Sequence, residues 1–204
     1  MTKAMEKLYD NLDNAKAFSL SFTNFVYFYN DISRWDCHTE ICKKCGKTYQ
    51  SKDYLAPKAN CMKPTGILHS LEFGVSPELR EDLISKFDIT EADFRPVRSK
   101  RGEIVYYQIT PQHVMLPMHE ENGWSVQKIC PQCGSVQYDR PRRENSIGEP
   151  YFYISQPALD EMHDLNVTCE CFTRYYPLFV ISQRVYDYLT ERYPKTHYYP
   201  FFLK

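Results

Sequence analysis

The chain has 204 residues, of which 43% are hydrophobic and 25% charged, a composition typical of a soluble globular protein with a sizeable core. Its formal net charge of −1 argues against a broad surface for nucleic acids or anionic membranes, since both need concentrated positive charge. No apolar run approaches the roughly 20 residues that cross a bilayer, and residues 1–6 lack the apolar core of a signal peptide. We therefore expect a cytoplasmic protein whose eight cysteines serve as metal ligands or thiols and form no disulfide framework.

Residues 1–17 carry apolar side chains at helical spacing, which predicts a short amphipathic helix that packs on the rest of the chain. Residues 19–30 are rich in aromatic and β-branched side chains and predict a strand. With 17 Tyr, 12 Phe and 2 Trp, many further segments favour strands as well. Beyond the first helix, we expect a single α+β domain over residues 18–204 with a mainly antiparallel or mixed sheet.

The first metal-binding pattern, Cys42-Lys43-Lys44-Cys45-Gly46, follows this strand. Two cysteines three residues apart present both sulfurs to one tetrahedral ion, and the glycine permits the positive φ of a tight turn. Cys37, His38 and Cys61 lie nearby in the sequence and are candidates for a second metal site. His38 pairs with Cys42 at a spacing of four residues, although an exposed loop histidine is the simpler interpretation.

A short unit of strand, serine and amphipathic helix occurs three times, with the serines at positions 76, 155 and 182. Each serine precedes a helical pattern and is predicted to be its N-cap, which argues against a nucleophilic role. The repetition predicts strand-then-helix units on a shared sheet. Residues 93–98 and 103–109 predict a hairpin, and the apolar residues 198–204 predict a strand at the end of the chain.

The second pattern, Cys130-Pro131-Gln132-Cys133-Gly134, follows Trp124. Each pattern supplies half of a tetrahedron, so we expect one site with Cys42, Cys45, Cys130 and Cys133 as ligands of one structural zinc ion per chain. Because 84 residues (46–129) separate the two halves, the fold must bring residues 37–50 and 124–140 together as a split zinc-ribbon-like module.

Other interpretations of these cysteines remain open. Four unrelated buried thiols would show the same pattern, and a redox role lacks the helix N-terminus that lowers a thiol pKa. His119-Glu120-Glu121 followed by the second pattern partly matches zinc deaminases, but the proline lies inside the cysteine pair and the interval is short. Cys169 and Cys171 would lie about 7 Å apart on one face of a strand, too far for easy chelation.

Two basic clusters make a nucleic-acid-binding zinc protein the main alternative. The first contains Arg95, Arg98, Lys100 and Arg101, and the second contains Arg140, Arg142 and Arg143. Balanced acidic and basic residues, 26 and 25, argue against this interpretation. The sequence shows none of the motifs that would indicate an enzyme: no Ser-His-Asp triad, no phosphate-binding glycine loop and no pair of acidic residues within a known catalytic motif.

Three features together resemble the double-CxxCG motif protein family. They are the two Cys-x-x-Cys-Gly patterns, Trp124 before the second pattern, and residues 179–182 followed by a helix. The resemblance covers most of residues 19–204. The N-terminal 17 residues and the cysteines at 37, 61, 169 and 171 depart from the family pattern.

That resemblance implies an immunity protein, which is a non-enzymatic cytoplasmic inhibitor that binds and neutralises a cognate bacterial toxin. The expected partner is therefore a protein, with no membrane and no nucleic acid involved. The resemblance leaves open which toxin is bound and which surface binds it.

Overall fold

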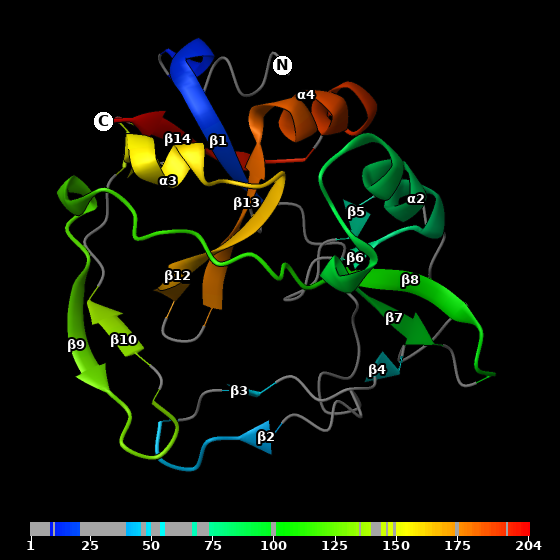
Figure 1. Ribbon diagram of the computed structural model, residues 1–204, viewed down its shortest axis with the longest axis horizontal. Helices are drawn as coiled ribbons and strands as arrows, with labels where there is room; N and C mark the ends of the chain where they lie inside the picture. Colours follow the sequence, from blue (N-terminus) through cyan, green and yellow to red (C-terminus); the bar gives the residue numbers. More distant parts are fainter. Residues whose placement is uncertain are drawn as a thin grey trace. The chain divides into compact units, whose positions relative to one another are not determined.

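The computed structural model describes residues 9, 11–20, 40–45, 48–49, 54–55, 67–68, 74–98, 101–134, 136–139, 144–145, 147–148, 150–173, 176–194 and 196–204 (Figure 1). The fold is α+β with antiparallel and mixed sheets, as the sequence predicts. Clustering of contacts divides the chain into one unit of residues 1–23 and 111–204 and a second of residues 24–110. No helix in the described ranges is long and apolar enough to cross a membrane.

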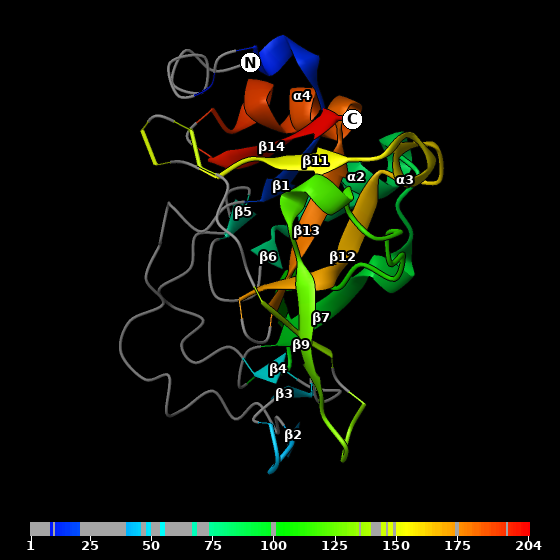
Figure 2. The same ribbon diagram turned by 90° about the vertical axis from the view of Figure 1, so that its left-hand side faces the viewer.

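The first unit is built on a five-stranded sheet with the order β11-β14-β1-β13-β12. Neighbouring strands are antiparallel, except that β11 and β14 are parallel. Figure 2 shows β11, β14 and β1 side by side. The elements of this unit are η1 (Leu12–Asn14), β1 (Ala15–Leu20), η5 (Glu120–Asn122), β9 (Ser125–Ile129), β10 (Val136–Asp139), β11 (Phe152–Ile154), α3 (Gln156–Asp160), β12 (Leu165–Thr173), β13 (Tyr176–Ser182), α4 (Gln183–Arg192) and β14 (Tyr198–Leu203).

Aromatic side chains fill the face of this sheet that α4 covers. Phe18 of β1 stacks on Tyr186 of α4, with ring centroids 3.6 Å apart and planes 8° apart, and Tyr198 of β14 meets Tyr186 edge-on at 5.0 Å. All three residues are at most 1% exposed. Burial of each such side chain stabilises the fold by about 2 kcal/mol, so ring packing contributes to holding α4 on the sheet.

The opposite face packs against α3 and the segment before η5. Its cluster of buried residues consists of Ala17, Met115, Met118, Phe152, Ile154, Ala158, Leu178, Val180 and Phe201. Strand alternation explains the two faces, since Ala17 and Phe18 are consecutive residues of β1 and point to opposite sides.

The outer edge of β12 is covered by the chain just before η5. The N–H of Met115 donates to the carbonyl of Val167, and the N–H of Val167 donates to the carbonyl of His113, both at 2.9 Å. Pro111 and Pro117 lie on either side of this short contact. Because proline has no N–H to donate, Pro117 cannot continue the ladder as Met115 does.

The other edge of the sheet, at β11, is covered by the side chain of Asn122 and by the backbone N–H of His119, which donates to the carbonyl of Tyr153 at 3.2 Å. The Asn122 amide accepts the N–H of Tyr153 at 2.8 Å and donates to the carbonyl of Tyr153 at 2.7 Å. Asn122 is 2% exposed, so its amide replaces a neighbouring strand at a buried position. Both edges thus have ladder groups paired within the chain, which limits edge-to-edge association.

A bulge in β12 places polar side chains inside the unit. Beyond the pair Val167 and Phe179, the register of β12 against β13 shifts. There the Thr168 hydroxyl accepts the N–H of Leu178 at 2.9 Å and donates to the carbonyl of Glu170 at 2.6 Å. The hydroxyl therefore takes the place of a backbone carbonyl in the ladder, and Glu170 is left only 4% exposed.

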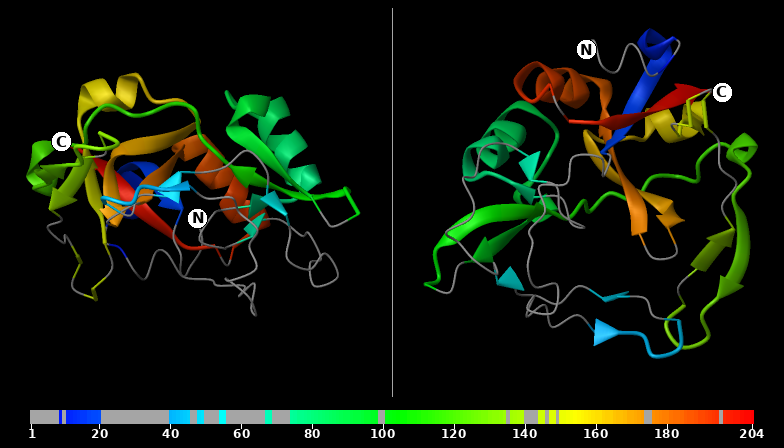
Figure 3. Two further views of the ribbon diagram at one scale, coloured as in Figure 1. Left: turned by 90° about the horizontal axis from the view of Figure 1, so that it is seen from below. Right: turned by 180° about the vertical axis from the view of Figure 1, so that it is seen from behind.

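The second unit is built on a five-stranded sheet with the order β4-β7-β8-β6-β5, in which only β4 and β7 are parallel. Figure 3 shows α2 lying beside β7 and β8. The guanidinium of Arg80 in α2 lies 4.6 Å from the ring centroid of Tyr107 and 5.7 Å from that of Phe94. The elements of this unit are β2 (Glu40–Ile41), β3 (Thr48–Tyr49), β4 (Tyr54–Leu55), β5 (Ile67–Leu68), β6 (Gly74–Val75), α2 (Pro77–Lys86), η4 (Glu91–Asp93), β7 (Phe94–Arg98) and β8 (Ile104–Ile109).

All three predicted serine caps are confirmed. Ser76, Ser155 and Ser182 each accept the backbone N–H of the residue three positions later, at 3.2, 3.4 and 3.4 Å. The prediction that the three units share one sheet is only partly correct. Helices α3 and α4 pack on the sheet of the first unit, whereas α2 belongs to the second unit. The predicted hairpin of β7 and β8 and the strand β14 are both present.

The predicted N-terminal helix over residues 1–17 is wrong at its end. Residues 12–14 form a single turn of 3-10 helix, and residues 15–17 already belong to β1, because Ala15 and Ala17 are buried in the sheet. Residues 1–8 and 10 lie outside the described part of the chain. Of the strand predicted over residues 19–30, the structure describes only residues 19 and 20, which end β1.

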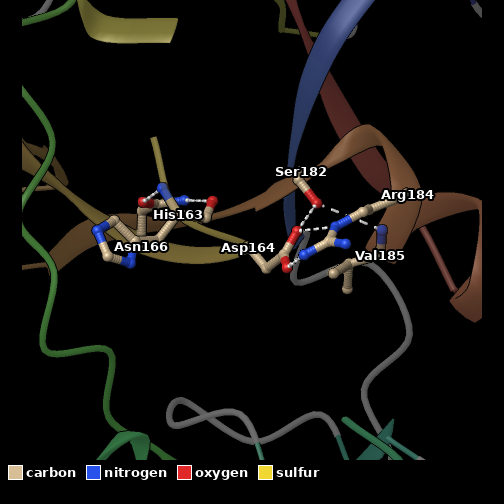
Figure 4. Close-up of polar contacts among 6 residues, drawn as sticks. All are labelled: His163, Asp164, Asn166, Ser182, Arg184 and Val185. Carbon is tan, nitrogen blue, oxygen red and sulfur yellow. Dashed lines mark hydrogen bonds and ion pairs between the residues drawn. The ribbon is translucent and has the colours of Figure 1, made fainter. Parts of the chain in front are cut away.

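Asp164 joins the start of β12 to the start of α4 (Figure 4). This carboxylate is 4% exposed, accepts the Ser182 hydroxyl at 2.5 Å and the Arg184 Nε at 2.7 Å, and also forms an ion pair with Arg184 Nη2. Ser182 thus donates to the carboxylate while it caps α4. The buried charge is neutralised by a bidentate partner whose own side chain is 60% exposed.

We expect the substitution Arg184→Ala to lower the free energy of unfolding by about 3 kcal/mol, because it leaves a buried carboxylate without its countercharge. Adding Asp164→Asn should recover part of that loss, since a neutral amide costs less to bury. Urea unfolding measures both. Arg192→Ala on the same helix is the control, with an expected cost of about 0.5 kcal/mol for an exposed contact with Tyr188. Equal effects of the two arginine substitutions would contradict this role of Asp164.

Candidate metal centre

The two Cys-x-x-Cys patterns form turns of the same construction. Ile41, just before the first cysteine, pairs with Thr48 in the hairpin of β2 and β3, and Ile129 pairs with Val136 in the hairpin of β9 and β10. In both cases the partner lies seven residues further on. A short ladder therefore fixes each cysteine pair at the tip of a hairpin.

Gly134 shows why the second turn ends in glycine. Its φ is +68°, a conformation that residues with a β-carbon resist, and its N–H donates to the carbonyl of Cys130 at 2.9 Å. This bond closes the turn over Pro131, whose ring fixes φ near −65°. Gly46 lies outside the described residues.

The four predicted ligands lie together. The sulfur atoms of Cys42, Cys45, Cys130 and Cys133 are all within 4.8 Å of one another. Cys42 is 4% and Cys130 2% exposed, whereas Cys45 and Cys133 are half-buried. Each turn therefore contributes one inner sulfur, from its first cysteine, and one outer sulfur, from its second.

These distances fit a tetrahedral ion. Zinc–sulfur bonds of about 2.3 Å place neighbouring sulfurs of a tetrahedron roughly 3.8 Å apart, so the cluster needs to contract by about 1 Å at most. A shell of four sulfurs suits soft or borderline metals and is unsuited to magnesium or calcium, which prefer oxygen. The cluster can thus hold a metal ion.

No other group of three or more potential ligands appears among the described residues. Cys37, His38 and Cys61 lie outside those residues, as does the side chain of Cys171. His119 is not part of the cluster; its Nδ1 accepts the N–H of Glu121 at 3.3 Å and caps η5. The partial match to deaminases therefore gains no ligand from His119.

The structure describes only a small part of the two basic clusters predicted from the sequence. In the first, Arg95 is half-buried and Arg101 exposed, and the side chains of Arg98 and Lys100 are not described. The second cluster, at residues 140–143, lies outside the described residues.

The sequence did not reveal the apolar face of the β9–β10 hairpin. Val126 pairs with Tyr138 and Ile129 with Val136, so a register shift in β9 places Val126 and Ile129 on one side although two residues lie between them. They are 57% and 61% exposed. A bulge breaks the alternation by which a strand face is recognised in a sequence, which is why this face was missed.

No protein-family model, curated protein or solved structure matches the chain.

Cys169 is a half-buried thiol in β12 that does not belong to the cluster. Burial, and secondarily the charge and hydrogen bond of Glu170, raise its pKa to about 12. Since only the thiolate is nucleophilic, a raised pKa lowers reactivity at neutral and mildly alkaline pH.

We therefore expect Cys169 to react with iodoacetamide at pH 8 roughly 100-fold or more slowly than a free cysteine in a peptide, because its thiolate fraction is that much smaller. Peptide mass spectrometry of timed samples measures the rate. Glu170→Gln should accelerate the reaction only in part, as burial remains. A rate equal to that of the peptide would contradict the raised pKa.

Proposed function

We propose that Cys42, Cys45, Cys130 and Cys133 bind one structural zinc ion per chain, and that the protein is a non-enzymatic immunity protein that neutralises a cognate toxin. The observation that carries the first part is the mutual approach of four sulfurs to within 4.8 Å. Tetrahedral four-sulfur sites are typical of structural zinc. Zinc is also consistent with these four thiols, which are buried or half-buried and form no disulfide with one another.

Four protein ligands leave no coordination position for water or substrate. A catalytic zinc ion keeps such a position, where bound water is activated. A saturated site therefore supports a structural role for the metal. This is the reason for preferring a binding protein over a metalloenzyme.

The charges near the cysteines suit such a site. Zinc with four thiolates carries a net charge of −2, because four negative sulfurs surround one doubly positive ion. Lys43 and Lys44 lie within the first turn, and Lys128 lies two residues before Cys130; all three are exposed. Positive side chains close in sequence to the cysteines would offset part of that charge.

The metal would stabilise the protein by closing a long loop. It would join cysteines on either side of 84 residues (46–129), and the loop-entropy relation gives about 4 to 5 kcal/mol for a cross-link of this length. The binding free energy of the metal would further raise the free energy of unfolding, because the folded chain holds the site and the unfolded chain does not. The ion would thus act on stability and not on chemistry.

The toxin-neutralising part of the proposal rests on the resemblance to double-CxxCG motif proteins. Its motif residues are the two cysteine patterns, Trp124 and residues 179–182. Ser182 of the last segment supports a role in the fold, because it both caps α4 and binds Asp164. The resemblance implies that the chain alone, without catalysis, blocks one protein partner.

The purified protein should contain one equivalent of zinc, measured by inductively coupled plasma mass spectrometry with iron measured in parallel. Cys42→Ser and Cys133→Ser should each reduce zinc below about 0.2 equivalents and lower the unfolding midpoint, because three sulfurs hold the ion poorly. Cys169→Ser is the matched control and should retain the metal. Full zinc content in Cys42→Ser would overturn the assignment, whereas two equivalents would mean that Cys37, His38, Cys61 or the pair of Cys169 and Cys171 also binds metal.

Co-expression with the product of the neighbouring reading frame should relieve the toxicity of that product, with no nuclease, deaminase or other activity needed from this chain. A growth assay and co-purification of the pair measure this effect. Cys42→Ser should weaken the rescue through loss of stability, and Cys169→Ser should not. Absence of rescue would refute the immunity role. Binding to generic DNA at low salt that falls steeply with added salt would favour the nucleic-acid alternative.

A further inference from the structure

The four cysteines differ in their access to solvent in a regular way. Cys42 and Cys130, the first cysteines of the two turns, are 4% and 2% exposed. Cys45 and Cys133, the second cysteines, are half-buried and can be reached from solvent. In each turn, therefore, the first cysteine is the inner one and the second cysteine is the outer one.

We propose that Cys45 and Cys133 are modification sites for hydroperoxides, and that oxidation of either outer sulfur expels the metal. This inference rests on the proposed zinc site. It extends that site from a static clamp to one that an oxidant can open.

Two properties favour reaction at the outer sulfurs. A metal-bound cysteine is a thiolate, which is the form that attacks a peroxide, so all four ligands have the required charge state. Only the outer two also have the exposure that lets a small oxidant approach. Oxidation is selective for thiolates that are both deprotonated and accessible.

The chemistry is balanced within the cluster. The thiolate of Cys45 or Cys133 attacks one oxygen of the hydroperoxide, the S–O bond forms, the O–O bond breaks, and the leaving hydroxide or alkoxide takes up a proton. A second thiolate of the cluster, within 4.8 Å, attacks the sulfenic sulfur, and its hydroxide leaves as water after protonation. Two thiolates lose two electrons in total, and one hydroperoxide is reduced.

Metal release follows from ligand count. A disulfide is a poor ligand compared with two thiolates, so the ion keeps at most two of its four sulfurs. Two thiolates do not complete a tetrahedral shell, and the ion dissociates. The loop-closing stabilisation by the metal is then lost.

The test uses the full-length zinc-loaded protein treated with graded amounts of hydrogen peroxide in the presence of dimedone, which traps sulfenic acids. Peptide mass spectrometry locates the adducts, and a colorimetric zinc chelator follows release. We expect at least tenfold more adduct at Cys45 and Cys133 together than at Cys42 and Cys130 together. Zinc release should rise in parallel.

Cys169 provides an internal control in the same sample. It is half-buried like the outer cysteines, but its raised pKa keeps it a neutral thiol. Absence of adduct at Cys169 shows that exposure alone is insufficient. Adducts chiefly at Cys42 and Cys130, or peroxide that leaves zinc bound, would overturn the inference.

Zinc content before oxidation separates the two proposals. If the protein contains zinc but Cys45 and Cys133 do not carry most of the adduct, only the proposal of these two cysteines as modification sites is refuted. Protein that contains no zinc refutes the structural zinc site itself, and the release of metal proposed here is refuted with it.

Discussion

Four thiolates can share one tetrahedral ion only if their sulfurs approach to about 4 Å, and the remaining features of the candidate site depend on this constraint. In this chain each cysteine pair lies within a short hairpin. Ile41 and Ile129 begin these turns by pairing seven residues ahead, and Gly134 completes one of them in a left-handed conformation. The four sulfurs that these turns present can hold a metal ion.

The first unit shows a second general feature, in which polar side chains take over tasks of the backbone. The Asn122 amide pairs with the edge of β11 as a strand would, and the Thr168 hydroxyl bridges the bulge of β12. Asp164 joins Ser182 and Arg184 where β13 passes into α4. Each of these side chains is buried and hydrogen-bonded. Removing one would leave its partner buried without a hydrogen bond, which would lower the stability of the fold.

Local patterns explain why several elements were predictable. The serine caps at 76, 155 and 182 depend on hydrogen bonds that span three residues, so the short sequence around each contains the cause. The β7–β8 hairpin and the cysteine turns are equally local. By contrast, residues 15–17 continue a helical apolar pattern into β1, where burial of Ala15 and Ala17 against distant strands overrides it.

The sequence by itself determined the α+β class, the capped helices and the identity of the four sulfurs, because these follow from residue type and short spacing. Only the tertiary structure decided which cysteine of each turn is buried, how the strands are ordered, and that α2 packs on a different sheet from α3 and α4. It also decided that a bulge in β9 exposes Val126 and Ile129 together. These properties depend on contacts between segments far apart in the chain, which no local spacing encodes.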